Sequence, residues 1–68
     1  MGLRELRQER GLSLEAVAYL ADLDQATVSR IERGLVEPER KTVVKLARAL
    51  GMSVGRMREL LASTTAAR

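Results

Sequence analysis

The sequence predicts a single all-α domain built from five short helices. Its 68 residues suffice for one modest hydrophobic core. Apolar residues make up 46% of the chain but include one aromatic, Tyr19, so the core must consist of aliphatic side chains, which helices pack readily. Five segments with helical spacing of apolar residues follow one another, separated by short breaks that hold glycines or capping residues. These observations favour helices over strands.

The boundary between the first two helices is marked by a helix-ending residue and a helix-capping residue that are close together in sequence. The first is expected over about residues 3–10, and Gly11 is placed to end it. The second begins after Ser13, whose hydroxyl can accept a hydrogen bond from a backbone N–H of the first turn. The side chains expected to face inward are Leu3, Leu6, Leu14, Val17, Ala18 and Ala21.

Only three residues, 22–24, separate the second helix from a third over about residues 25–33. Asp24 is the expected N-cap of this third helix. Leu23 and Val28 have the spacing of a hydrophobic staple, which fixes the direction from which the chain enters a helix. A break this short predicts a fixed angle between the two helices.

The fourth helix is expected over about residues 40–50, with Gly51 after it, and Ser53 is the expected cap of a fifth. We place one domain at residues 1–63 and expect residues 64–68 to form a frayed C-terminal tail. The side chains expected on the inner sides of these two helices are Val43, Leu46, Ala47, Leu50, Val54, Met57, Leu60 and Leu61.

The composition argues against most enzyme chemistry. The chain has no cysteine and no histidine, which removes disulfides, the usual metal ligands and Ser-His nucleophiles, so we expect no cofactor, no metal and no enzyme activity. Glu5, Glu9 and Glu15 alternate with arginines as on any solvated helix. The sequence has no long apolar run of the kind found in a signal peptide or membrane span, which predicts a cytoplasmic protein without membrane contact.

The net charge is +3, and residues 24–68 hold nine of the twelve basic residues. The excess favours a polyanionic partner, although many ordinary small proteins are equally basic. The third helix carries a more specific signal, because its side opposite Val28 and Ile31 is polar and basic. The residues of this outer face are Gln25, Ala26, Ser29, Arg30 and Arg33.

Glutamine and arginine side chains can bond adenine and guanine edges in the major groove, and small side chains allow close approach. In isolation such a face is more simply interpreted as a solvated helix surface. Here it follows a helix and a three-residue turn, the arrangement of a helix-turn-helix unit whose second helix enters the groove. The sequence therefore predicts a recognition helix at about residues 25–33.

A pair of charges is predicted to hold that helix from behind. Arg7 falls on the apolar side of the first helix, and Glu32 lies near the inner edge of the third. A charge removed from water needs a partner, so we expect the two to form a structural ion pair. The alternative is two independently solvated charges.

Nearly the whole chain resembles the phage-repressor (Xre/Cro-type) helix-turn-helix family of transcriptional regulators. This resemblance implies a compact five-helix, lambda-repressor-like domain that binds double-stranded DNA as a homodimer at near-palindromic operators and regulates transcription, most simply as a repressor. It also implies pairing of Arg7 with Glu32. The residues that carry the resemblance are 3–7, 11–13, 27–34, Pro38 and 46–51.

The resemblance also assigns roles to individual residues. It implies base contacts by four residues of the third helix, and phosphate contacts by the start of the second helix and by the start of the fourth. We add Ser29 and Arg33 of the outer face as backbone contacts. The base-contacting set is Gln25, Ala26, Thr27 and Arg30, and the backbone-contacting set is Ser13, Ser29, Arg33, Arg40 and Lys41.

The sequence departs from the family pattern at three positions. Leu14 stands where the family often has a glutamine that touches a phosphate, which puts that contact in doubt. Asp22 replaces the turn glycine and adopts the left-handed conformation less comfortably. Arg40 stands at a usually apolar position, where it is either a phosphate anchor or a solvated charge. Lys45 and Arg48 are interpreted as part of a solvated face, not as site residues.

The apolar residues near the C-terminus leave two possibilities open. Met57, Leu60 and Leu61 offer a dimer surface, or they only close the core of one chain. The function also has an alternative, because the same fold can serve as a protein-binding module such as an antitoxin or a bridging factor.

Overall fold

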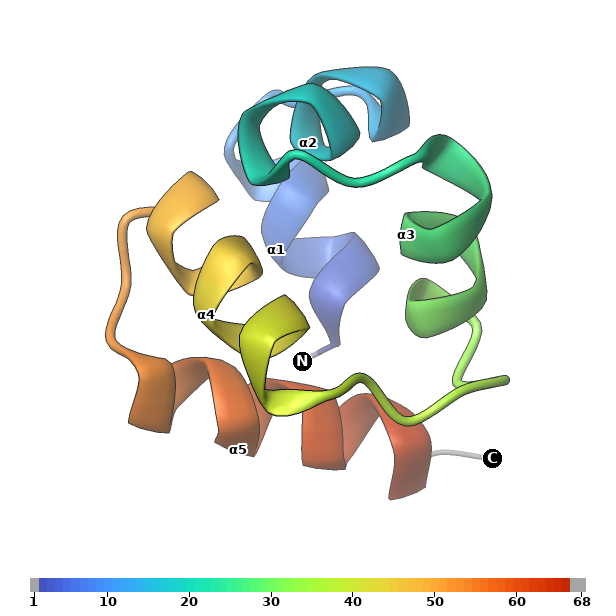
Figure 1. The fold of residues 1–68 in the computed structure, drawn as a ribbon, viewed down its shortest axis with the longest axis vertical. Coiled ribbons are helices and arrows are strands. Elements are labelled where there is room, and N and C mark those ends of the chain that lie inside the picture. The colour runs from blue at the N-terminus through green and yellow to red at the C-terminus, as the bar shows by residue number, and fades with distance from the viewer. Residues whose placement is uncertain (1, 67–68) are drawn as a thin grey trace.

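Five helices form the part of the chain that the computed structural model describes, which is residues 2–66, with side chains as far as Ser63. No strand occurs in that part, so the predicted all-α class is confirmed. In Figure 1, α1 lies in the middle and the other helices surround it. The helices are α1 (Leu3–Glu9), α2 (Leu14–Ala21), α3 (Gln25–Glu32), α4 (Arg40–Ala49) and α5 (Val54–Ala66).

The core lies where the five helices converge. α2 packs against α3 and α4, α4 also packs against α5, and α1 contacts α3 and α5. Aliphatic side chains with the predicted spacing fill the interior, while Leu14, Val54 and Leu60 are half-buried at its margin. The buried hydrophobic residues are Leu3, Leu6, Val17, Ala18, Ala21, Val28, Ile31, Val43, Leu46, Ala47, Leu50, Met57 and Leu61.

The turn between α2 and α3 depends on an unusual backbone conformation. Asp22, the C-cap of α2, has φ 57° and ψ 48°, the left-handed region that glycine enters without strain. It is the one residue other than glycine with a positive φ in the described part of the chain. Its backbone N–H donates to the carbonyl of Tyr19 at 3.2 Å, and that of Leu23 donates to Ala18 at 2.8 Å. These bonds satisfy the carbonyls of Ala18 and Tyr19 in the last turn of α2, so the turn forms here with an aspartate in the left-handed conformation.

The observed helix ends differ slightly from the predicted ones. Arg33 and Leu50 are C-caps rather than helical residues, a shift of one position at ends where helices commonly fray. α5 continues to Ala66, so residues 64–66 of the expected tail have helical backbone. Extending an existing helix adds one backbone hydrogen bond per residue without the cost of a new nucleus. The rest of the expected tail, residues 67–68, lies outside the described residues.

The helices were compared with the length and apolar character of membrane-spanning helices. In the described part of the chain, none combines the length and the apolar character needed to cross a bilayer.

Candidate nucleic-acid interface

The first turn of α3 is held by its capping residue. The backbone N–H of Thr27 donates to Oδ1 of Asp24 at 2.9 Å, as the sequence predicts for an N-cap. The hydrogen bond from this N–H to the charged carboxylate lowers the pKa of Asp24 below its ordinary value. Ser13 caps α2 in the same way, accepting from the N–H of Ala16 at 3.0 Å. Both helices of the unit therefore begin at the predicted residues.

The inner face of α3 is part of the core. Val28 is completely buried and Ile31 is 2% exposed. Leu23, just before the cap, is half-buried and packs against the same cluster, which is where a staple residue is expected to lie. These contacts fix the rotation of α3 about its axis, so its opposite side must face outward.

The Arg7–Glu32 ion pair joins α1 to the back of α3, as the sequence predicts. Arg7 Nε lies 2.5 Å from Glu32 Oε2, and a second guanidinium nitrogen donates to Oε1 at 3.3 Å. The third nitrogen donates to the carbonyl of Leu12 at 2.9 Å. The side chains of Arg7 and Glu32 are 13% and 6% exposed. This bidentate geometry satisfies two charges that are largely removed from water.

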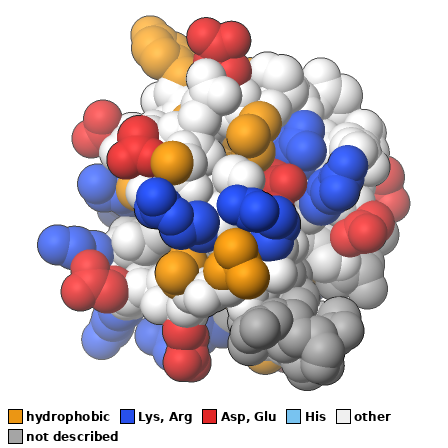
Figure 2. Space-filling model, turned by 90° about the vertical axis from the view of Figure 1, so that its right-hand side faces the viewer, with side chains coloured by type: hydrophobic (Ala, Val, Ile, Leu, Met, Phe, Trp, Pro, Cys, Tyr) orange, Lys and Arg blue, Asp and Glu red, His pale blue; other side chains and the backbone are white. Residues whose placement is uncertain are grey.

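The outer face of α3 is polar, basic and accessible. Gln25, Ala26 and Arg30 are exposed, and Thr27 and Ser29 are half-buried at its edges. Arg33, at the C-cap, is exposed beyond the last turn. Figure 2 views the molecule from the side on which α3 lies and shows Lys and Arg side chains across the middle of this surface. The structure thus brings the predicted base-contacting residues together on one short helix.

The predicted backbone contacts flank this helix. Ser13 lies exposed at the start of α2, and Lys41 lies exposed on the first turn of α4. Leu14, the departure from the family pattern, is half-buried against the core and offers no polar group to a phosphate. The start of α2 therefore presents Ser13 but lacks the glutamine that the family often places beside it.

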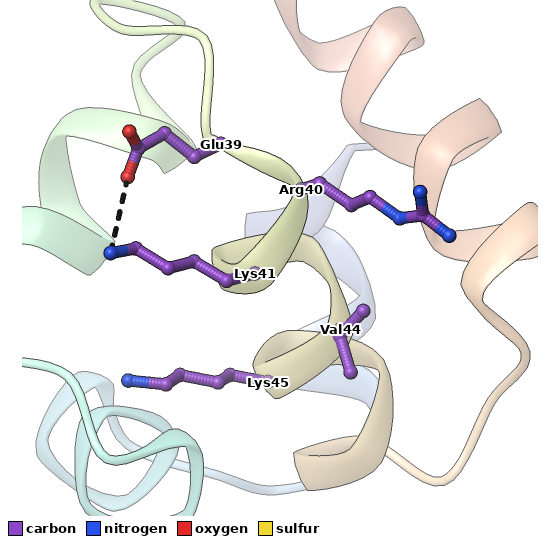
Figure 3. A pocket seen from close by; sticks show the side chains of 5 residues that line it. All are labelled: Glu39, Arg40, Lys41, Val44 and Lys45. Atoms are coloured by element: carbon purple, nitrogen blue, oxygen red, sulfur yellow. Dashed lines mark ion pairs between the residues drawn. The ribbon is translucent and has the colours of Figure 1, made fainter.

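The first two turns of α4 form an open hollow lined by Glu39, Arg40, Lys41, Val44 and Lys45. In Figure 3, Lys41 and Lys45 extend from α4 in one direction, and Arg40 extends in the other, toward the side on which α5 is drawn. Lys41 Nζ lies 3.9 Å from Glu39 Oε1, and Lys45 Nζ lies 4.0 Å from Asp22 Oδ2. Arg40 and Lys41 both line this hollow, but their side chains extend in different directions from α4.

The proposed dimer surface near the C-terminus needs correction. Met57 is completely buried and Leu61 is 5% exposed, because both close the core of a single chain. Leu60 is half-buried against that core. Of the two alternatives left open by the sequence, core closure therefore describes Met57 and Leu61, and neither has a surface to offer a second copy.

Two features were not anticipated from the sequence. A guanidinium nitrogen of Arg10 donates to the carbonyl of Leu50, which ties the end of α1 to the C-cap of α4. Tyr19 and Leu20 stand on the outside of α2, 85% and 52% exposed. Their side of α2 could have been identified as outward from the helical spacing of Val17, Ala18 and Ala21. The Arg10 contact depends on tertiary packing and has no comparable signal.

Known proteins similar to this chain also contain a helix-turn-helix unit. Residues 3–56 match the family model described as Helix-turn-helix. Over 52 residues the chain is 44% identical to the HTH-type transcriptional regulator DdrOP3 of Deinococcus deserti, covering 76% of this chain and 40% of that protein. Over 52 residues it is 38% identical to the HTH-type transcriptional regulator PuuR of Escherichia coli, covering 76% of this chain and 28% of that protein. The chain thus aligns with less than half the length of these relatives, and no solved structure matches it.

Proposed function

The chain belongs to the helix-turn-helix family, and from this premise we propose that it is a sequence-specific, double-stranded DNA-binding regulator of transcription. The observation that carries the proposal is the outer face of α3, a polar and basic surface on a helix whose inner face is locked into the core. The similarity to proteins named as HTH-type transcriptional regulators supports it.

Base reading is assigned to the first two turns of α3. Gln25 has the two polar groups needed to bond N6 and N7 of adenine, and Arg30 can fork onto O6 and N7 of guanine. Ala26 is small enough to approach a thymine methyl group, and Thr27 reaches base edges from the side of the helix. Gln25, Ala26 and Thr27 lie in the first turn of α3, and Arg30 lies in its last turn on the exposed side.

Orientation on the duplex is assigned to contacts with phosphates, which carry affinity but little sequence information. Ser13 at the start of α2 and Lys41 at the start of α4 flank the recognition helix, and Ser29 and Arg33 extend its own polar face.

The regulator is proposed to act as a cytoplasmic homodimer and as a repressor. Two recognition helices about 34–36 Å apart would read the halves of a near-palindromic operator. Occupation of that operator excludes other proteins from the same DNA, which is the simplest route to repression. The contact between copies lies elsewhere than Met57 and Leu61, because these side chains are in the core of each chain.

The decisive experiment is selection of binding sites from a random duplex library, followed by sedimentation of the complex with the selected site. We expect a near-palindromic sequence and two chains per duplex. Affinity should fall steeply with salt, since log K changes by about −0.9 per log unit of salt for each phosphate neutralised. Absence of duplex binding at low salt would overturn the proposal. A single half-site with one chain would overturn the homodimer.

A second candidate is a protein-binding module such as an antitoxin or a bridging factor. The exposed Tyr19 and Leu20 on α2 favour it, because protein interfaces are enriched in large apolar and aromatic side chains. The salt experiment separates the two functions: a module of this kind would show negligible duplex affinity even at low salt.

A further inference from the structure

Lys45 lies beside the turn that leads into α3. Its Nζ is 4.0 Å from Oδ2 of Asp22, and its side chain is 42% exposed. Figure 3 shows Lys45 extending parallel to Lys41, one turn away on α4, with Arg40 on the other side. The helical spacing alone suggested a solvated stripe, but the packing of α4 against α2 brings this stripe to the turn.

The position of Lys45 can be compared with the dimensions of DNA. Asp22 precedes Gln25 by three residues, so their Cα atoms are no more than about 11 Å apart. The major groove is about 12 Å wide, with phosphates along both edges. A duplex that accepts the first turn of α3 has phosphates within about a groove width of that end of the helix, and Lys45 Nζ lies beside Asp22, three residues before it.

We infer that Lys45 acts with Lys41 as a phosphate-binding pair for the duplex seated on α3, and that Arg40 is the solvated charge. The inference rests on the proposed function and deepens it. Two ammonium groups that extend in one direction can follow successive phosphates of one strand, whereas Arg40 extends away from them. Lysine is suited to this role as a point charge on a flexible stem.

Carboxylates near both lysines do not prevent this role. Asp22 faces Lys45 at 4.0 Å and Glu39 faces Lys41 at 3.9 Å, with side chains that are 97% and 75% exposed. Ion pairs this exposed contribute little, so a phosphate can replace either carboxylate at small cost. In the free chain Lys45 lies beside the Asp22 carboxylate, and on DNA a phosphate takes its place.

The test measures the salt dependence of binding to a random-sequence duplex, by fluorescence anisotropy from about 50 mM to about 200 mM salt. Phosphate contacts are independent of sequence, so no operator is needed. We expect Lys45→Ala to lower the slope of log K against log salt by about 0.9, Lys45→Arg to restore it, and Arg40→Ala to leave it unchanged. Arg48→Ala, an exposed charge on the same helix, is the matched control and should also leave it unchanged. Thermal unfolding should be unaltered in all four variants.

The outcomes separate this inference from the function on which it rests. Failure of the unmodified chain to bind any duplex would overturn the proposed function. Normal binding with an unchanged slope for Lys45→Ala would overturn the inference alone. Equal losses for the Lys45, Arg40 and Arg48 variants would also overturn it, because net charge rather than a local contact would then explain the effect.

A second variant tests the competition with Asp22. Asp22→Asn keeps a residue that tolerates the left-handed conformation and removes the charge facing Lys45. We expect it to tighten duplex binding several-fold at low salt. Glu59→Gln, on the exposed side of α5, makes the same change in net charge away from this surface and should have little effect. Equal tightening by the two variants would contradict a local role for the Lys45–Asp22 pair.

Discussion

The two faces of α3 have opposite properties although they belong to one eight-residue helix. The inner face is buried, apolar and tied to α1 by the Arg7–Glu32 pair. The outer face is polar, and its Gln25 and Arg30 side chains are exposed. With the proposed function, this difference divides stability and DNA binding between the two faces. Substitutions should therefore change one property and leave the other intact.

The largest expected effect is on stability, from the inner face. Glu32→Leu leaves the Arg7 guanidinium without its carboxylate at a site where both side chains are nearly buried. Removal of one partner from a buried ion pair costs about 3–5 kcal/mol. A chain of this size has little more stability than that to lose. Urea unfolding followed by circular dichroism should show the loss as a lower midpoint.

The double variant Arg7→Met with Glu32→Leu is the control for this prediction. An apolar pair of similar volume removes both charges together, and such replacements are often neutral or stabilising. We expect it to recover most of the lost stability. If Glu32→Leu alone were as stable as the unmodified chain, the ion pair would not stabilise the fold. The stabilising role assigned to the inner face of α3 would then be contradicted.

A smaller effect, on binding rather than stability, is expected from the outer face. Gln25→Ala should weaken binding to the selected operator by about 1–3 kcal/mol and relax the preference at one base position. Its unfolding midpoint should stay close to that of the unmodified chain, because Gln25 is exposed. Titration of the selected and the random duplex in parallel measures both quantities. Equal losses on the two duplexes would show that Gln25 does not read a base.

The smallest effect is expected on the pH dependence of stability, from Asp24, the N-cap of α3. The pKa of Asp24 is lowered in the folded chain by the N–H of Thr27, so its carboxylate stabilises the fold above the unfolded pKa. That contribution disappears as the pH falls through the lowered folded pKa. Asp24→Asn caps a helix without titrating, and it should lose less stability than the unmodified chain between about pH 6 and pH 2.

Urea midpoints at the two pH values measure this difference. Glu37→Gln, an exposed carboxylate of the loop before α4, is the control and should behave like the unmodified chain. If Asp24→Asn and the unmodified chain lose the same stability in acid, the cap contributes nothing that depends on charge.

Most of the fold followed from local patterns. The caps at Ser13, Asp24 and Ser53 each accept a hydrogen bond from the helix they begin. They were predictable because capping involves residues within a single turn. The Arg7–Glu32 pair was predictable for another reason: a charge on an apolar stripe needs a partner, and few opposite charges lie on facing stripes.

The errors have a common cause, which is packing between distant segments. Met57 and Leu61 share an apolar pattern with a dimer surface, and only the position of α5 under the rest of the domain buries them. The approach of Lys45 to Asp22 depends on how α4 packs on α2. A spacing of four residues shows that two lysines share a stripe but not what the stripe faces.

The sequence by itself determined five helices, their caps and the polar face of α3, because each of these depends on residues within a turn or two of one another. Tertiary structure decided which apolar residues are buried and placed Lys45 beside the turn that precedes α3. Those outcomes depend on the distances between helices, and the spacing of residues within one helix does not specify these distances. The division has a physical basis: hydrogen bonds and periodicity act along the chain, whereas burial and electrostatic proximity act across it.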